Sequence, residues 1–445
     1  MKLNIKIMRK IYIFTLLILF NFLASYAQEL LTKETAVSLA LENNYGIRMA
    51  ENNVKIAENN KSIYNSGYLP SVFANAGASH SNDNSIASRQ DGTSVEINNA
   101  KSSRYNGSVG LNYIIFDGLG RSYNYKKLKE SHHLSELEAQ TVIQNSLVQI
   151  FINYYEVARI FENKKNIAES LLISKQRLER MTYGFEYGQN TKLDVLNAEV
   201  DVNNDSIRYI NEQRLLVNSK RNLNLLLGRA VTIDFTVETT VSFDLLFEYQ
   251  SLFSKAKDFN VEMLKVDKSI QISEYDIKIS KSSLYPFLNV NASYGYNNSK
   301  NNRTSLFQSI ESDGLTAGVS LNWNIFDGGT TKTRIQNAKI NAANIQIQKE
   351  QVENELERNV ANALEVYNNA LFILKAEEKN VETNNVNFSR SEEQFKLGQI
   401  TSIQFRLAQV NLLNAHSNLN QAKYDAKNAE LFLLQLTGDI LNTKF

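Results

Sequence analysis

The sequence predicts a mainly α-helical protein with a membrane β-barrel, built from a tandem duplication. Three observations indicate this: an N-terminus typical of export, one pattern that occurs twice at a constant spacing, and alternating strands between long helical stretches in each copy. The chain has 445 residues, with 48 basic and 47 acidic side chains, 2 prolines and no cysteine. Because proline breaks helices, so few prolines allow long uninterrupted helices.

The composition also excludes several classes of function. A chain without cysteine has no disulfide, thiolate nucleophile, zinc ribbon or iron–sulfur cluster. Its 4 histidines do not form the His-Glu-x-x-His pattern of zinc hydrolases, so we expect no metal site and no cofactor. A near-neutral chain offers no strong basic field for phosphates, so we expect no nucleic-acid partner. We find no paired acid and base with a supporting motif, and therefore expect no catalytic residues and no enzyme activity.

The N-terminus sets the expected compartment. Four basic residues precede an apolar run over 11–23, and residues 25–27 place small side chains where a signal peptidase reads them. We therefore expect a signal peptide over 1–27, cut before Gln28. An uncleaved anchor is the alternative, although the run is short against the roughly 20 residues of a membrane-spanning helix.

The chain repeats itself at a fixed interval. Three anchors share an offset of 210 residues: Phe116-Asp117-Gly118 with Phe326-Asp327-Gly328, Gly188-Gln189 with Gly398-Gln399, and Gly228 with Gly438. The two prolines, Pro70 and Pro286, are 216 residues apart, so the second copy has a loop six residues shorter. We expect a first repeat over 28–228, a linker with a short strand over 229–249, and a second repeat over 250–445.

Each proline is followed by alternating sequence, because proline and its restricted neighbour mark the change from helix to strand. Apolar and polar residues alternate with period two after Pro286 and again before Phe326. We expect hairpins over about 70–117 and 286–327, with polar loops roughly over 84–103 and 298–311. The apolar side chains expected to face lipid in the second copy are Leu288, Val290, Tyr294, Val319, Leu321 and Trp323.

Each Phe-Asp-Gly is expected to close a hairpin and open a long helix, with Asp117 and Asp327 accepting N–H bonds at the helix start. A heptad stripe of apolar residues follows the first one, in a stretch without proline over 121–183. We expect Gly188 and Gly398 to end these helices, so that two antiparallel helices meet at a tight turn in each copy.

Four strands per chain cannot close a barrel, and unpaired strand edges are not tolerated in lipid. Two chains would supply eight strands, whose interior is filled by side chains, whereas three would supply twelve, about the smallest number with a passage. We therefore expect a homotrimer with a shared 12-stranded barrel.

On these features the chain resembles the outer-membrane efflux (TolC-like) family across essentially all of the mature sequence. The resemblance rests on the duplicated order of elements and on the run Tyr187-Gly188-Gln189-x-Thr191-x-x-Asp194-Val195-Leu196-x-Ala198. It implies a homotrimeric duct in the outer membrane lipid of a Gram-negative bacterium, with long coiled-coil helices forming an α-barrel in the periplasm. Its implied partners are a periplasmic adaptor and an inner-membrane transporter, either proton-driven (RND) or ATP-driven (ABC).

The function implied by the resemblance is passive export in a tripartite efflux pump or a type I secretion system. A structural coiled-coil protein that spans the envelope without transport is the alternative. The sequence does not indicate the transported substrate.

The resemblance also implies two kinds of site at the helical tips. The residues that match adaptor contacts are Tyr187, Gly188, Gln189, Leu397, Gly398 and Gln399. Asp194 matches an acidic gate residue, but Phe395 and Ile400 stand where the family places its Tyr and Arg partners. We therefore expect a duct held closed more by apolar packing around Phe395 than by ion pairs, with Lys192 and Arg406 as the nearest cations in sequence to Asp194. The alternative is that Asp194 is a solvated residue of the second helix.

Overall fold

The computed structural model describes residues 29–243 and 247–441, so the expected signal peptide over 1–27 lies outside the described residues. The chain divides into two compact units. The unit that we call the helical unit takes its described residues from Met1–Met49, Val142–Asn260 and Leu356–Phe445. The strand unit contains Ala50–Thr141 and Val261–Glu355. Each unit therefore contains parts of both repeats.

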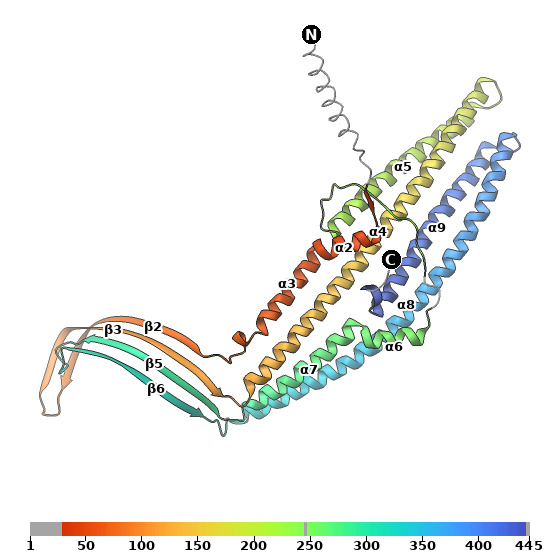
Figure 1. Ribbon diagram of the computed structural model, residues 1–445. Coiled ribbons are helices and arrows are strands. Elements are labelled where there is room, and N and C mark those ends of the chain that lie inside the picture. The colour runs from red at the N-terminus through yellow and green to blue at the C-terminus, as the bar shows by residue number, and fades with distance from the viewer. Residues whose placement is uncertain (1–28, 244–246, 442–445) are drawn as a thin grey trace, which may run out of the picture. The chain divides into compact units, whose positions relative to one another are not determined.

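The strand unit contains one antiparallel four-stranded sheet in the order β2-β3-β5-β6 (Figure 1). Its strands are β2 (Ser71–Ser88), β3 (Ser94–Phe116), β5 (Phe287–Lys300) and β6 (Ser309–Asn322). The prediction of a polar loop over 84–103 is wrong, because β2 and β3 remain paired as far as Ser88 and Ser94. Backbone pairing does not require apolar side chains, so a polar sequence did not mark the end of these strands.

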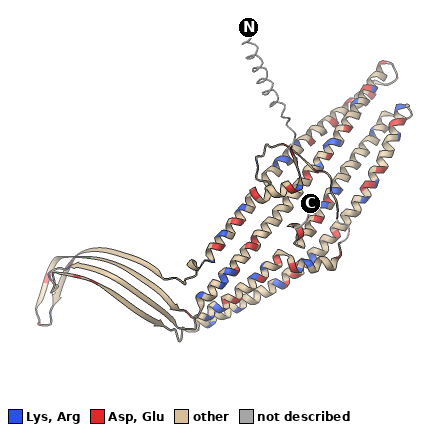
Figure 2. Cartoon of the chain, in the orientation of Figure 1, with Lys and Arg blue, Asp and Glu red and all other residues tan. Residues whose placement is uncertain are grey.

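The register of the sheet places the apolar side chains on one face. Val290 lies opposite Tyr113 on one side and Val319 on the other, whereas Asn291 lies opposite Asn112 and Gly318. Directly opposed residues point to the same face, so the predicted alternation is confirmed. The parts of the strands nearest the helices carry no charged residue (Figure 2): 71–79, 105–116, 287–299 and 314–322. Each is long enough for a tilted strand to cross a bilayer, which takes about 9–11 residues.

Two long helices follow the two hairpins, α4 (Gly120–Glu186) and α8 (Thr330–Lys396), each of 67 residues. At 1.5 Å per residue each is about 100 Å long. The predicted start signals are confirmed, because Asp117 Oδ2 accepts the backbone N–H of Arg121 at 2.9 Å and Asp327 Oδ2 that of Thr331 at 2.8 Å. The helices that precede the hairpins are α3 (Tyr45–Asn60), followed by the 3-10 turn η1 (Ile63–Asn65), and α7 (Val261–Ser282).

The helical unit packs around aromatic residues of α4. It adds α2 (Lys33–Asn43), α5 (Lys192–Leu226), α6 (Tyr249–Phe259), α9 (Ser402–Leu436) and the 3-10 turn η2 (Asp439–Leu441). Ile150 and Tyr154, which belong to the apolar heptad stripe expected within 121–183, are fully buried. The short strand expected in the linker is β4 (Phe235–Val237), which pairs in parallel with β1 (Glu29–Leu31).

The two repeats differ at the junction between strand and helix. Gly118 has φ +67°, and a Cβ there would lie 2.4 Å from the carbonyl oxygen of Ser282 at the end of α7. Gly328 has φ +69°, but a Cβ there would meet nothing within 4 Å in the described part of the chain. Phe326 is accordingly 83% exposed, whereas Phe116 is 36% exposed. The first junction is packed and the second is open.

This difference predicts the effect of adding a methyl group at Gly118. Gly118→Ala should lower the free energy of unfolding by about 1–3 kcal/mol more than Gly92→Ala, because only the former forces a Cβ against backbone. Gly92 is the control, since it also has positive φ (+86°) but open space around it. Denaturant unfolding of the purified protein measures both. Equal losses would mean that backbone strain alone, and not close packing on α7, requires glycine at 118.

Candidate functional site

The two tips of the helical unit have the same backbone turn. Gly188 follows α4 and Gly398 follows α8, each with φ +73°. The next residue closes the turn in both, since Gln189 N–H donates to the carbonyl of Gly184 at 2.6 Å and Gln399 N–H to that of Gln394 at 2.8 Å. A left-handed residue after a helix favours glycine, which explains the two glycines. Both predicted helix ends are confirmed.

Both tips restart with a capping box. Thr191 Oγ1 accepts the backbone N–H of Asp194 at 3.2 Å, and Asp194 Oδ2 accepts the backbone N–H of Thr191 at 2.9 Å. Thr401 and Gln404 make the same reciprocal pair in the second tip. Hydrogen bonds from the Thr191 side chain, and then from its backbone, lower the pKa of Asp194. The Asp194 carboxylate is therefore satisfied within its own turn.

The structure does not join Asp194 to either cation named from the sequence. Lys192 Nζ lies 5.7 Å from the ring centroid of Phe185, and the Arg406 guanidinium binds Asp205 instead. The physical reason is that a side chain at the third position of a helix points back to the N-cap, where Thr191 already supplies two donors. Asp194 and Arg406 do line the same small cavity of about 250 Å³.

An open cleft of about 710 Å³ lies between the tips. It brings together residues that the sequence assigned to separate roles, because Tyr187, Gln189 and Gly398 line it together with Asp194 and Phe395. Of the remaining tip residues, Leu397 is 73% exposed, and a Cβ at Gly188 would meet nothing within 4 Å. Gln399 is exposed as well.

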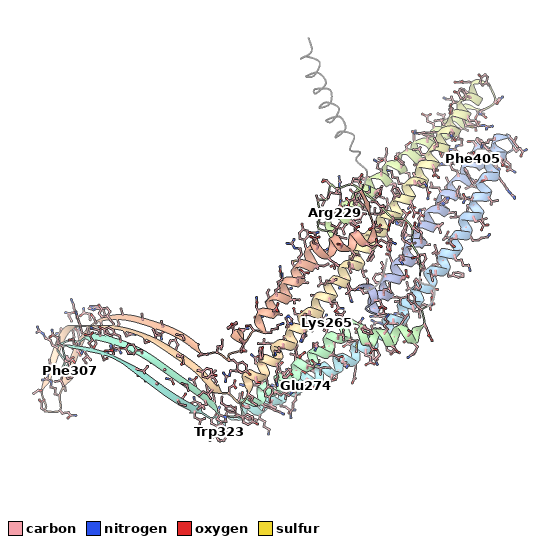
Figure 3. All side chains as sticks on the ribbon, in the orientation of Figure 1. Arg229, Lys265, Glu274, Phe307, Trp323 and Phe405 are labelled. Atoms are coloured by element: carbon pink, nitrogen blue, oxygen red, sulfur yellow. The ribbon has the colours of Figure 1, made fainter. Side chains whose placement is uncertain are left out.

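Phe395 is the centre of an apolar cluster that joins the two tips within one chain. Its ring stacks on that of Phe405 at a centroid distance of 4.8 Å and an interplanar angle of 7° (Figure 3 labels Phe405). Met181 of α4 and Val195 of α5 are buried against the pair. The guanidinium of Arg180 lies 5.1 Å from the centroid of the Phe395 ring. Phe395 and Phe405 therefore belong to one buried cluster with residues of both helices of the first tip.

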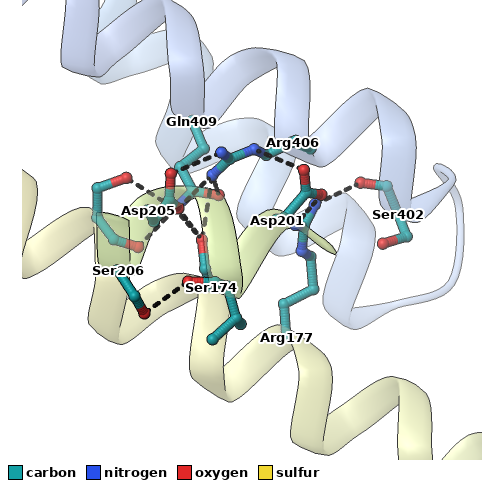
Figure 4. A network of polar contacts seen from close by, with 10 residues as sticks. Ser174, Arg177, Asp201, Asp205, Ser206, Ser402, Arg406 and Gln409 are labelled. Carbon is teal, nitrogen blue, oxygen red and sulfur yellow. Dashed lines mark hydrogen bonds and ion pairs between the residues drawn. The ribbon is translucent and has the colours of Figure 1, made fainter. Parts of the chain in front are cut away.

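Next to this cluster lies a network of buried charges that the sequence reasoning missed (Figure 4). Both terminal nitrogens of Arg406 contact the two carboxylate oxygens of Asp205, each at 2.7 Å. Ser174 Oγ donates to Asp205 Oδ2 at 2.6 Å. Asp201 binds Arg177 and lies 3.5 Å from Arg406 Nε. The network thus connects α4, α5 and α9.

The network is charge-balanced, with two aspartates and two arginines, and most of it is inaccessible to water. Asp205 is 1% exposed and Arg177 2%. Burial opposes ionisation of Asp205, but the hydrogen bonds from Arg406 and Ser174 outweigh it and leave the pKa of Asp205 below its usual value. Asp201 and Asp205 are four residues apart on one helix, where like charges repel each other unless a cation lies nearby. That spacing is the sequence signal that could have revealed the network.

A cluster of potential metal ligands, which the sequence analysis did not anticipate, lies on α4 in the strand unit. The ligand atoms of His132, His133 and Glu136 lie within 4.8 Å of one another. However, Lys61 Nζ lies 3.2 Å from His132 Nε2. An ammonium group this close to the imidazole opposes a second cation, so we assign no metal site here.

Comparison with known proteins identifies the class. A family model described as "Outer membrane efflux protein" matches residues 36–229 and 252–439. Outer membrane protein TolC of Vibrio cholerae is 23% identical over 304 residues, covering 67% of this chain and 68% of that protein. Outer membrane efflux protein BepC of Brucella suis is 20% identical over 405 residues, covering 91% and 84%.

The structural comparison agrees. The Campylobacter jejuni CmeC outer membrane channel superposes with a TM-score of 0.76 at 15% identity, covering 92% of this chain and 86% of that one. The fold is therefore that of channels with an α-barrel and a β-barrel. Within residues 29–243 and 247–441, no helix has both the length and the apolar character to cross a membrane.

The chain belongs to the outer membrane efflux protein family. It is an outer-membrane protein of a Gram-negative bacterium that extends into the periplasm.

The buried network predicts a large effect at Arg406. Arg406→Gln should destabilise the helical unit by about 3–5 kcal/mol, because it leaves the carboxylate of Asp205 buried without its bidentate partner. The exposed Arg390→Gln is the control and should change the free energy of unfolding by less than about 0.5 kcal/mol. Denaturant unfolding checks both values.

A double variant separates charge from packing. Adding Asp205→Asn to Arg406→Gln should restore part of the lost stability, since it removes the unpaired charge. Strictly additive losses would show that the two side chains do not depend on each other.

Proposed function

We propose that three copies of this chain form one outer-membrane duct, which passively exports substrate delivered by an inner-membrane transporter through a periplasmic adaptor. Membership of the efflux family supports the efflux role. The observation that carries the trimeric duct is the sheet itself, which has a charge-free band but only four strands.

The edges of the sheet require a partner in the membrane. β2 and β6 are the outer strands of the order β2-β3-β5-β6. In lipid, their unpaired N–H and C=O groups would each cost several kcal/mol. Pairing β6 of one chain with β2 of the next satisfies both edges, and three chains give a 12-stranded barrel with a passage.

The open second junction supports the same assembly. In the first junction, Gly118 and Phe116 pack near the end of α7. The segment equivalent to the end of α7 in the first repeat is residues 62–69, at an offset of 216. If residues 62–69 of the next subunit took that place, they would cover Gly328 and Phe326 as α7 covers Gly118 and Phe116. Each chain makes this junction contact once by itself. In a closed ring of three chains, the same contact would form again at each of the three boundaries between subunits.

This arrangement predicts that Phe326 matters only for assembly. Phe326→Ala should lower the temperature at which the detergent-purified trimer dissociates, because the side chain is 83% exposed within one chain and becomes covered between chains. Phe307→Ala is the control, since Phe307 is 64% exposed but lies in the loop between β5 and β6. Trimer mass at increasing temperature measures both. Equal dissociation temperatures for Phe326→Ala and wild type would contradict the proposed interface.

The helical tips are the proposed contacts for the adaptor. Tyr187 and Leu397 project from the two tips with most of their surface exposed, and the cleft between the tips is open. Glycine at 188 and 398 leaves room for a partner's backbone to approach closely. Apolar exposed side chains beside open backbone are typical of a docking surface.

The proposed gate is tested by conductance in planar bilayers. Asp194→Asn should reduce the cation selectivity of the pore, because three carboxylates around one axis favour cations. Asparagine keeps an oxygen acceptor for Thr191, so the capping box should survive and only the charge is lost. Glu199→Gln, which neutralises an exposed carboxylate five residues further along α5, is the control. If Asp194→Asn left both the ion selectivity and the resting conductance unchanged, Asp194 would have no gate or filter role.

A further inference from the structure

We propose that a pocket at the base of the central strand pair binds the headgroup of an anionic phospholipid from the periplasmic leaflet of the outer membrane. The pocket has a volume of about 320 Å³ and lies between the start of α4 and the end of α7, within the strand unit. The inference rests on the outer-membrane location, on the proposed duct, and on the expectation from the sequence that the face carrying Leu288 contacts lipid.

The pocket is amphipathic. Phe116, Leu119 and Tyr285 supply apolar surface, and Leu119 and Tyr285 are more than half exposed. Lys278 and Lys281, which also line it, supply two cations. An apolar wall next to ammonium groups suits a molecule with acyl chains and an anionic head.

The charges of the two lysines are not neutralised by a carboxylate among the described residues. Lys278 Nζ lies 5.0 Å from the ring centroid of Tyr275 and 6.0 Å from that of Tyr123. Among the residues that the structure describes, neither Lys278 nor Lys281 forms an ion pair, whereas the nearby Lys127 binds Asp276 at 2.6 Å. Aromatic faces hold the Lys278 side chain without neutralising it, so both cations are available to a phosphate.

The pocket lies where the membrane is expected to end. Phe116 is the last residue of the charge-free stretch 105–116, and a register shift after Ile114 places it opposite Leu288. Its side chain therefore shares the face that carries Leu288. Trp323, which is labelled in Figure 3, follows two residues after Leu321, the partner of Leu288 in β6. Its Nε1–H donates to the carbonyl of Leu284 at 3.1 Å. Tryptophan, tyrosine and lysine gather at membrane interfaces, where one end of each is apolar and the other polar.

Assembly of the barrel leaves this pocket open. It is formed where β3 ends and β5 begins, and these two strands are the central pair of the sheet. A neighbouring chain that pairs with β2 or β6 joins at the edges instead. The pocket therefore remains accessible to lipid in the proposed ring.

The duplicated sequence predicts one such pocket per chain. At the offset of 216, Ser62 and Asn65 stand in the places of Lys278 and Lys281. At the offset of 210, Gly329 and Thr333 stand in the places of Leu119 and Tyr123. The second junction thus lacks the basic and much of the apolar lining, so even when it is completed between chains it should not select an anionic lipid.

The test is lipid titration of the delipidated, detergent-purified oligomer by native mass spectrometry. Phosphatidylglycerol should bind at one molecule per chain, and about tenfold or more tightly than phosphatidylethanolamine, whose headgroup carries no net charge. Lys278→Gln with Lys281→Gln should abolish this preference. The control is Lys175→Gln with Lys375→Gln, which removes two exposed charges from the helical unit and should leave the preference intact.

Equal affinity for the two lipids in the wild type would overturn the proposal, as would an unchanged preference in the Lys278/Lys281 variant. Equal loss in the control variant would also overturn it, since binding would then follow net charge alone. Soluble glycerol phosphate should compete weakly, because it lacks the acyl chains that contact Phe116 and Leu119. Full displacement by glycerol phosphate at the lipid's concentration would make the site one for free phosphate esters and not for lipid. The oligomer mass is measured for every variant as a check on assembly. Loss of lipid preference with an unchanged oligomer mass concerns the pocket alone, whereas an oligomer that is not a trimer would contradict the proposed duct.

Discussion

Backbone hydrogen bonding in lipid is the constraint on which the rest of this structure depends. Every N–H and C=O of a membrane-crossing strand needs a partner, and four strands in the order β2-β3-β5-β6 satisfy only the inner ones. The outer edges of β2 and β6 have no hydrogen-bonding partner strand within the described part of one chain. The charge-free stretches, the face that gathers apolar side chains and the open second junction are all consistent with the proposed ring, in which another copy of the chain pairs at each edge.

Duplication gives the protein two copies of one local design in two environments. Both Phe-Asp-Gly turns cap a helix of the same length in the same way. One of them packs on α7, whereas the other has open space within the chain. The same contrast holds at the tips, where Thr191 and Thr401 use identical capping boxes but Asp194 supplies a charge and Gln404 does not. The differences between the copies thus mark the places where one repeat has a property that the other lacks.

The tips combine two kinds of packing that differ in their physical demands. The stacked pair of Phe395 and Phe405 is stabilised by buried apolar surface and ring stacking, and it contains no charge that needs a counter-charge. The network of Arg177, Asp201, Asp205 and Arg406 needs each partner in place, because a buried charge without its counter-charge is strongly unfavourable. Together they hold α4 and α5 of the first tip against the second tip, so the open cleft has a defined shape on both sides.

The sequence by itself determined the features that depend on neighbours along the chain. The prolines, the Phe-Asp-Gly turns, the glycines after the long helices and the period-two alternation predicted the order of elements and the orientation of the strands, because each acts through local backbone geometry. The loop over 84–103 was misjudged since strand pairing depends on backbone groups that polarity does not reveal.

Only the tertiary structure decided which charges meet. Arg406 binds Asp205 across 201 residues of sequence and not Asp194, which is satisfied by Thr191 in its own turn. Lys278 and Lys281 come to lie beside Phe116 and Leu119 because β3 and β5 are neighbours in the sheet, which no local pattern specifies. Contacts between distant segments follow from packing, and packing is a property of the whole fold.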